Sequence, residues 1–237
     1  MKILAFDTAT METTCALVDG KKVVAESSVN SRASHSEGLV SMIDHMLPSV
    51  GWAMEDVDLI ATGVGPGSFT GLRISVVLAK VFARSLSIPV VGVSTLKALA
   101  RQVAEDGIVV PLFDARRERV YAGVFEKEGE RLRRIQKDDA YSVESILKKA
   151  PKGAILIGDG LKTYREAFSV REDFILYPEH LSRVSAAAIA FEGQAQYEEE
   201  GSSNPYALEP NYLRPTQAMR EYRRKHGESV DARSDRE

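Results

Sequence analysis

One segment constrains the fold of this chain more than any other, and its sequence is Gly63-Val64-Gly65-Pro66-Gly67-Ser68-Phe69-Thr70-Gly71-Leu72-Arg73. Its four glycines and one proline lie between an apolar run, residues 57–64, and a long apolar-rich stretch, residues 72–86. This order predicts a strand, a tight loop and a helix. Glycine permits φ > 0 and lets another backbone or an anion approach closely. The bare amides at the start of such a helix favour negative charge.

Arg73 stands out because a cation in the first turn of a helix opposes the helix dipole. We therefore expect it to have an anionic partner, either a ligand or a carboxylate of the same fold. The loop lacks the glycine-lysine spacing of a Walker A loop, and it has Ser68 where a dinucleotide fingerprint needs its third glycine. A phosphate-binding loop and a sharp turn without a ligand remain equal alternatives on loop shape alone.

Composition sets broad limits on the fold and the partners. The chain has 237 residues, 44% hydrophobic and 27% charged, which suits one large or two small domains with an apolar core. A net charge of −3 provides no global basic field for nucleic acid or acidic membranes. The single cysteine, Cys15, excludes an intramolecular disulfide and is expected to be a small buried strand residue. Because the N-terminus enters a strand at once and no apolar stretch has membrane-spanning length, we expect a cytoplasmic protein.

Hydrophobic periodicity and turn residues predict two similar units. The first has strands at 3–7, 13–18, 22–28, 57–64 and 89–93 and helices at 34–50, 70–86 and 95–104. Ser34 and Glu37 have capping-box spacing at the start of the first helix. The second has strands at 108–113, 120–126, 131–136 and 154–157 and helices at 142–150, 161–168 and 182–197. This layout predicts a duplicated α/β fold with mixed sheets.

The domain boundaries follow from this layout. We expect one domain over residues 1–105 and a second over residues 106–215. The charged tail, residues 216–237, is expected to be disordered or a frayed helix.

The stretch Ile3-Leu4-Ala5-Phe6-Asp7-Thr8-Ala9-Thr10, followed by the alternating run 13–18, resembles the first hairpin of the actin, Hsp70 and sugar-kinase superfamily. Three further segments and the glycine loop make the resemblance more specific: Ser34-His35-Ser36-Glu37-Gly38-Leu39, Asp114-Ala115-Arg116-Arg117-Glu118-Arg119-Val120-Tyr121 and Tyr212-Leu213-Arg214-Pro215. Together they resemble the bacterial TsaB (YeaZ-like) family, which is required to make threonylcarbamoyladenosine in transfer RNA. The resemblance covers residues 1–215. It implies two actin-like (ribonuclease H-like) domains, each with a five-stranded mixed sheet flanked by helices.

The same resemblance argues against ordinary ATP binding. In working members of the superfamily, a residue like Asp7 orients a metal-bound water, and a glycine two positions later admits the phosphate. Here that position is Ala9, the second half offers Asp114-Ala115-Arg116, and the adenosine loop Gly158-Asp159-Gly160 carries a carboxylate. We expect no cofactor. The loop residues then form at most a vestigial ligand site: Asp7, Gly65, Gly67, Thr70, Gly71 and Arg73.

Metal chemistry and catalysis are not expected either. The paralogue TsaD resembles this chain and carries a metal-binding His-x-x-x-His where Thr95 and Leu99 stand here. A leucine side chain has no donor atom for a metal. The four histidines show no ligand spacing, and His35 fits a surface or capping role better than that of a catalytic base.

The helices at 38–50 and 70–86 carry more apolar residues than one sheet can cover. They could be buried within their own domain. The TsaB resemblance implies instead a surface that pairs with TsaD, or with a second copy of this chain, and the pathway ATPase TsaE is a further candidate partner. The residues of that interface would be Leu39, Val40, Met42, Ile43, Met46, Ile74, Val77, Leu78 and Val81.

The leading hypothesis is a non-catalytic scaffold and activator that binds TsaD for threonylcarbamoyl transfer to the adenosine beside the anticodon. The tRNA would be contacted only through the complex, since the chain lacks a basic stripe. Arg116, Arg117 and Arg119 are a modest exception, and Glu118 dilutes them. The alternative is an ATP-dependent phosphotransferase or a metalloprotease of the same superfamily, based on Asp7 and the glycine loop.

Because the chain departs from the ATP-binding pattern, the glycine loop is no longer expected to bind phosphate. Its use is expected to be architectural, because it lets the chain turn sharply from Val64 into an apolar helix. Arg73 is then a candidate for an internal or inter-subunit ion pair.

Overall fold

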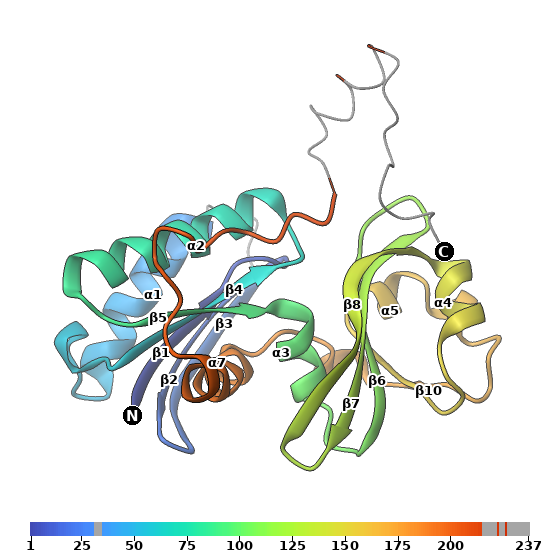
Figure 1. Cartoon of the computed structure of the whole chain (residues 1–237), viewed down its shortest axis with the longest axis horizontal. Coiled ribbons are helices and arrows are strands. Elements are labelled where there is room, and N and C mark those ends of the chain that lie inside the picture. The colour runs from blue at the N-terminus through green and yellow to red at the C-terminus, as the bar shows by residue number, and fades with distance from the viewer. Residues whose placement is uncertain (31–34, 215–221, 223–225, 227–237) are drawn as a thin grey trace.

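Two mixed β-sheets of five strands each stand side by side, as Figure 1 shows. The computed structural model describes residues 1–30, 35–214, 222 and 226. The predicted capping box of Ser34 and Glu37 and nearly all of the predicted tail lie outside the described residues.

The first sheet contains β1 (Lys2–Asp7), β2 (Glu12–Asp19), β3 (Lys22–Asn30), β4 (Leu59–Gly65) and β5 (Val90–Ser94). Its strand order is β3-β2-β1-β4-β5. The central strand β1 pairs antiparallel with β2 and parallel with β4. Four helical segments accompany this sheet: α1 (His35–Ser49), η1 (Met54–Asp56), α2 (Phe69–Leu86) and α3 (Thr95–Arg101).

The second sheet contains β6 (Gly107–Asp114), β7 (Arg119–Glu128), β8 (Arg131–Ser142), β9 (Ile155–Ile157) and β10 (Ile175–Leu176). The helical segments after β8 are α4 (Val143–Lys149), α5 (Asp159–Thr163), α6 (Arg165–Phe168), η2 (Glu179–Leu181) and α7 (Ala186–Glu200). The order β8-β7-β6-β9-β10 repeats that of the first sheet, with the same parallel and antiparallel pairings. The predicted duplication of a mixed α/β unit is therefore confirmed, and Asp7 and Asp114 end equivalent strands.

The alternation of side chains along β1 sorts the core into layers. Leu4 and Phe6 face α1 and α2, and Cys15 of β2 is buried in this same layer, as predicted. Ile3 and Ala5 face the other way, towards α3 and α7. That second layer continues without interruption into Val109 and Phe125 of the second sheet, so the two halves share one core.

Helix α7 follows the second sheet in the sequence but packs on β1, β2 and β4 of the first. In Figure 1 it lies against the first sheet, beside α3. Leu208, further along the chain, is also buried with the first sheet. The division at residue 105 stays a prediction, and any domain defined by packing would have to place α7 with the first half.

Three details differ from the sequence-based expectation. The helix predicted at 161–168 is two short helices, α5 and α6, which meet at Tyr164. Helix α7 begins after Ser185 rather than at Ser182, because the Ser185 hydroxyl caps it by accepting a hydrogen bond from the Ala188 amide. The two-residue strand β10 was too short to leave a periodic pattern.

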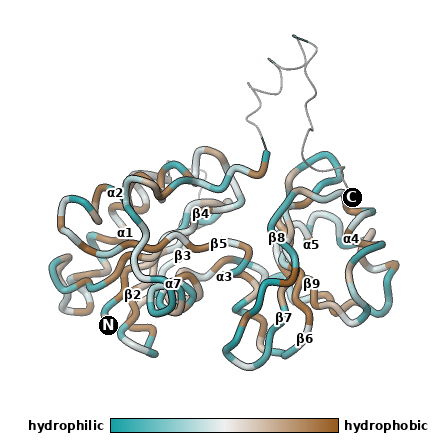
Figure 2. Tube along the Cα trace, viewed as in Figure 1, coloured by the Kyte–Doolittle hydropathy of each residue, from teal (hydrophilic) through white to brown (hydrophobic). Residues whose placement is uncertain are grey.

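Edge strand β8 extends to Ser142, beyond the predicted end at residue 136. Figure 2 shows it as a largely hydrophilic strand, in keeping with its three arginines, one lysine and two aspartates. Charged side chains on an edge strand discourage pairing with another chain. Within the described residues, no helix is both long and apolar enough to cross a membrane.

Candidate functional site

Asp7 ends β1 and is completely buried beside the glycine loop. Burial raises the pKa of its carboxyl group from the usual 3.8 to about 7, although the nearby amides of Ala9 and Thr8 lower it in part. Neither carboxyl oxygen completes a hydrogen bond within the described part of the chain. The carboxyl group lies against Gly63, where a methyl group would overlap it.

The glycine loop packs directly on the turn that follows β1. The amide of Ser68 donates to the carbonyl of Ala9 over 2.6 Å, and the Thr8 hydroxyl donates to the carbonyl of Gly71, also over 2.6 Å. A methyl group at Gly67 would overlap the Ala9 backbone, and one at Gly71 would overlap the Thr8 carbonyl oxygen. These glycines therefore permit a close approach between two backbones, which supports the architectural interpretation of the loop.

The remaining loop residues serve the same turn or lie on the surface. Gly65 has φ of 100°, which favours glycine, and its amide donates to the Thr95 hydroxyl over 3.1 Å. The Ser68 hydroxyl caps α2 by accepting a hydrogen bond from the Gly71 amide. Thr70 is exposed in the first turn of α2.

The first loop does not fit a nucleotide phosphate. Ala9 is buried, its carbonyl is used by Ser68, and Gly67 fills the space beside it. A phosphate placed there would have to displace the glycine loop from the end of β1.

The equivalent loop of the second half, which follows β6, also uses its polar groups in hydrogen bonds within the protein. The Asp114 amide donates to the Asp159 carboxylate over 2.9 Å, and the Arg116 amide donates to the Asp114 carboxylate over 2.7 Å. Burial, together with the charge of Asp114, raises the pKa of Asp159 to about 6, while the Asp114 amide lowers it in part. Because a carboxylate held at this place repels phosphate, the second half does not fit a nucleotide phosphate either.

The two positions that would carry histidines in a TsaD-like metal site are used for packing. Thr95 is buried and binds the Gly65 amide, and Leu99 is buried in the core shared by the two sheets. Among the described residues, no three histidine, cysteine, aspartate or glutamate side chains are grouped so that they could hold a metal ion.

The partners of Arg73 differ from the internal carboxylate that was predicted. Its Nε atom donates to the Tyr212 hydroxyl over 3.1 Å, and its guanidinium lies 4.0 Å from the centre of the Phe69 ring. No carboxylate of the described chain forms an ion pair with it. Among the described residues, the aromatic pair of Phe69 and Tyr212 occupies that side of the helix in place of the internal ion pair, and the inter-subunit ion pair stays a prediction.

Beside Arg73, an open apolar groove of about 460 Å³ runs along α2 and reaches α1. Its apolar walls include Val40, Ile74, Val77, Leu78 and Val81. Val40, Val77 and Val81 are 49%, 57% and 50% exposed, values that are high for neighbouring valines on one surface.

The structure corrects three of the predicted interface residues. Leu39, Ile43 and Met46 are buried against the first sheet, so they are not available to a partner. Val40 follows Leu39 in the sequence, so its side chain is turned by about 100° around α1 from that of Leu39. Met42 is partly buried and packs against the same core. The predicted surface therefore narrows to Val40 and the α2 residues, with Met42 at its margin.

A segment near the C-terminus, residues 203–214, was not identified as part of the site. Its backbone follows the first sheet, since the Ser203 amide donates to Val90 and the Asn211 amide donates to Val64. Tyr212 then packs on Phe69, and Arg214 donates to the Ala115 carbonyl over 2.8 Å. We call residues 203–214 the strap, because it joins the glycine loop to the second half.

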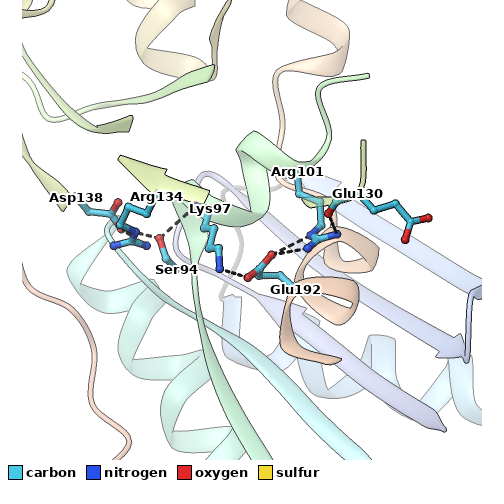
Figure 3. Close-up of polar contacts among 7 residues, drawn as sticks. All are labelled: Ser94, Lys97, Arg101, Glu130, Arg134, Asp138 and Glu192. Carbon is cyan, nitrogen blue, oxygen red and sulfur yellow. Dashed lines mark hydrogen bonds and ion pairs between the residues drawn. The ribbon is translucent and has the colours of Figure 1, made fainter. Parts of the chain in front are cut away.

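A charged network where the two halves meet was also missed (Figure 3). Glu192 of α7 is buried and pairs with Lys97 and with Arg101 of α3, the latter over 2.8 Å. Nearby, the Ser94 hydroxyl donates to Asp138 over 2.6 Å, and burial raises the pKa of Asp138. The signal for the network was a glutamate within the apolar run 186–193, together with two cations four residues apart on α3.

A cleft of about 380 Å³ lies between the two halves, next to the strap and the groove. Its lining includes Phe69, Asp114, Arg116 and Asp159. Phe69 lines both the groove and the cleft. The groove has almost entirely apolar walls, whereas the cleft has both polar and apolar walls.

Comparison with known proteins agrees with this arrangement. The family model described as TsaD, tRNA N6-adenosine threonylcarbamoyltransferase, matches residues 22–222. The tRNA threonylcarbamoyladenosine biosynthesis protein TsaB of Bacillus subtilis (strain 168) is 31% identical over 226 residues, which cover 92% of this chain and 96% of that protein. The TsaB protein of Buchnera aphidicola subsp. Schizaphis graminum (strain Sg) is 33% identical over 186 residues, covering 74% of this chain and 88% of the relative.

A solved structure supports the fold. YeaZ from Pseudomonas aeruginosa superposes with a TM-score of 0.78 at 24% identity, and the match covers 90% of this chain and 99% of that one. The predicted two-part actin-like architecture is therefore confirmed.

Proposed function

This chain belongs to the TsaB family of tRNA threonylcarbamoyladenosine biosynthesis proteins, and we propose that it is the non-catalytic subunit that binds and activates TsaD. TsaD would then transfer threonylcarbamoyl to the adenosine beside the anticodon. We assign the pair to the cytoplasm, where it would meet its tRNA.

The exposed apolar groove carries this proposal. Val40, Val77 and Val81 leave a continuous apolar surface in water, and burying it against a partner is favourable at about 25 cal/mol per Å². Arg73 lies at one end of the groove without a carboxylate of the described chain. A partner that presents an acidic residue there would complete the ion pair predicted for Arg73.

TsaD is a suitable occupant because its family model matches residues 22–222 of this chain. Two proteins of one family carry equivalent helix pairs and can pack them together in a nearly two-fold arrangement, as identical subunits do. A second copy of this chain is the competing occupant for the same reason.

The closed loops support a role without catalysis. Ala9 and Asp159 stand where a nucleotide phosphate and adenosine would be expected, and both are held by contacts of the fold. In the part of the chain that the structure describes, the occupied loops do not favour the alternative phosphotransferase, and the buried Leu99 gives no donor atom to a metalloprotease.

The test is to introduce charge into the groove with the double variant Val77→Glu, Val81→Glu. Co-purification and light scattering with TsaD should show at least a tenfold loss of pairing, because two carboxylates would lose their water in an apolar contact. Val170→Glu is a matched control, since Val170 is 80% exposed on the second half. Both variants should keep the wild-type circular dichroism spectrum. Pairing that survives in the double variant as well as in the control would show that the groove is not the interface.

A further inference from the structure

Three consecutive residues between β6 and β7 have left-handed backbone conformations: Arg116, Arg117 and Glu118, with φ of 60°, 56° and 56°. None of them is glycine, and side chains other than glycine adopt this conformation only at a cost. A run of three is held in place by the surrounding structure. Such strain is concentrated at functional sites, where it fixes side chains in a required position.

The first half of the turn is fixed by Asp114. Its carboxylate accepts hydrogen bonds from the Arg116 amide over 2.7 Å and from the Tyr164 hydroxyl over 3.0 Å. The Ala115 amide closes the turn by donating to the Arg119 carbonyl over 3.0 Å. The conformation is therefore specified by several independent contacts.

Two further elements hold the same turn. The Val143 amide at the start of α4 donates to the Glu118 carbonyl over 3.0 Å, and Arg214 of the strap donates to the Ala115 carbonyl over 2.8 Å. The strap thus brings a third guanidinium to the base of the turn.

The side chains that this turn presents are mainly cationic. Arg116 and Arg117 are exposed, and neither forms an ion pair with a described residue. Asp114 and Asp159 are half-buried beside the turn and remain opposing charges, although both accept hydrogen bonds from backbone amides. The exposed charges of the turn are those of Arg116, Arg117 and Glu118. Beyond the strap, residues 216–237 contain six lysines or arginines and five aspartates or glutamates, so this part of the sequence adds almost no net charge.

Arginine suits phosphate because its planar guanidinium donates two parallel hydrogen bonds to the oxygens. The net charge of −3 gives the chain no long-range attraction for RNA, so these arginines would act after TsaD has brought the RNA close. We propose that the turn 114–119 presents Arg116 and Arg117 to the phosphodiester backbone of the tRNA held by the complex. This inference rests on the proposed pairing with TsaD.

The test uses the full chain in complex with TsaD and measures tRNA affinity over a range of salt concentrations. In the double variant Arg116→Gly, Arg117→Gly, the guanidinium groups are lost while the left-handed backbone becomes easier to adopt. We expect the thermal midpoint to stay the same or rise, whereas tRNA binding weakens. The slope of log affinity against log salt should become shallower by about 1 to 2, as for the loss of one or two phosphate contacts.

Two controls separate charge from structure. Arg116→Lys with Arg117→Lys keeps the charge and should keep the salt slope. Lys152→Ala with Arg165→Ala removes two exposed cations elsewhere on the second half and should leave tRNA binding unchanged. Light scattering establishes TsaD pairing for every variant before RNA is added.

A glycine variant that pairs with TsaD but binds tRNA with the wild-type slope would overturn the inference. A control double variant that loses as much affinity would overturn it too, since the turn would then have no special role. A wild-type chain that fails to pair with TsaD would overturn the proposed function as well, and light scattering shows this independently of RNA.

Discussion

The Thr8 hydroxyl donates a hydrogen bond of 2.6 Å to the carbonyl oxygen of Gly71, and this bond joins the end of β1 to the first turn of α2. The amide of Ser68 reinforces the junction by donating to Ala9. Both bonds need two backbones to lie closer than a side chain would allow. The glycines of the loop thus serve the fold at the place where related proteins are expected to bind phosphate.

Gly71→Ala should therefore be strongly destabilising, because the new methyl group would overlap the Thr8 carbonyl oxygen. We expect the free energy of unfolding, measured in urea, to fall by about 3 kcal/mol or more. Gly38→Ala is the matched control, since a methyl group on that helical glycine meets nothing within 4 Å. It should stabilise the chain by up to about 1 kcal/mol. Equal stability of the two variants would contradict the architectural role of the loop.

Asp7→Asn should change how stability depends on pH. The folded pKa of Asp7 is raised to about 7 from 3.8, so the folded state holds a proton that the unfolded state loses as pH rises from about 4 to 7. Stability of the wild type is therefore lost over this window, and the loss is complete above the folded pKa. Asparagine does not ionise, so the advantage of the variant should grow from near zero at pH 4 to at most about 4 kcal/mol at pH 8.

The measurement is urea unfolding of both proteins across that pH range. Asp159 and Asp138, whose pKa values are also raised by burial, are present in both, so the difference between the curves isolates Asp7. A constant difference at all pH values would mean that Asp7 does not titrate in this window.

Much of the fold was predictable because it depends on local patterns. Alternating strands, such as those predicted at 13–18 and 22–28, and the glycine loop each leave a signal in a short stretch of sequence. The repeated strand order follows from the same patterns in the second half. The path of the strap was not predictable, because it follows β4 and β5 through backbone hydrogen bonds that do not require particular residue types. Only its end, Tyr212 to Arg214, left a signal in the sequence, and its contacts with Phe69 and Ala115 are distant in the chain.

The partner surface was only partly predictable. The number of apolar residues on α1 and α2 indicated that other parts of the protein, or a partner, must cover them. Composition alone did not show which side of α1 packs on the sheet. The buried set Leu39, Ile43, Met46 and Leu47 has spacings of four, three and one, which place it on one face of a helix. Closer use of that spacing would have separated Leu39 from Val40.

Truncation of Leu39 and truncation of Val40 should therefore have different effects, the first on stability and the second on pairing with TsaD. Leu39 is fully buried, so Leu39→Ala should lower the free energy of unfolding by about 2 to 5 kcal/mol. Val40 is 49% exposed, so Val40→Ala should change stability by less than about 0.5 kcal/mol and weaken pairing with TsaD. Urea unfolding and light scattering on both variants give the comparison. If Val40→Ala destabilises the isolated chain as much as Leu39→Ala, α1 has been assigned the wrong outer face.

Glu192 links α7 to the cations of α3 and should be needed to hold these two helices together. Glu192→Gln removes the charge but keeps the shape, leaving Lys97 and Arg101 only 29% and 20% exposed without their carboxylate. Breaking a buried pair from one side costs about 3 to 5 kcal/mol, and the partial exposure of the cations places the expected loss near the lower figure. Adding Lys97→Met should restore part of that stability, because the double variant buries one unpaired cation fewer. Glu144→Gln breaks an exposed pair with Lys148 and should leave the thermal midpoint unchanged. If Glu192→Gln also left the thermal midpoint unchanged, the apolar core alone would hold α7 in place. The charged network would then contribute nothing to the packing of α7 on α3.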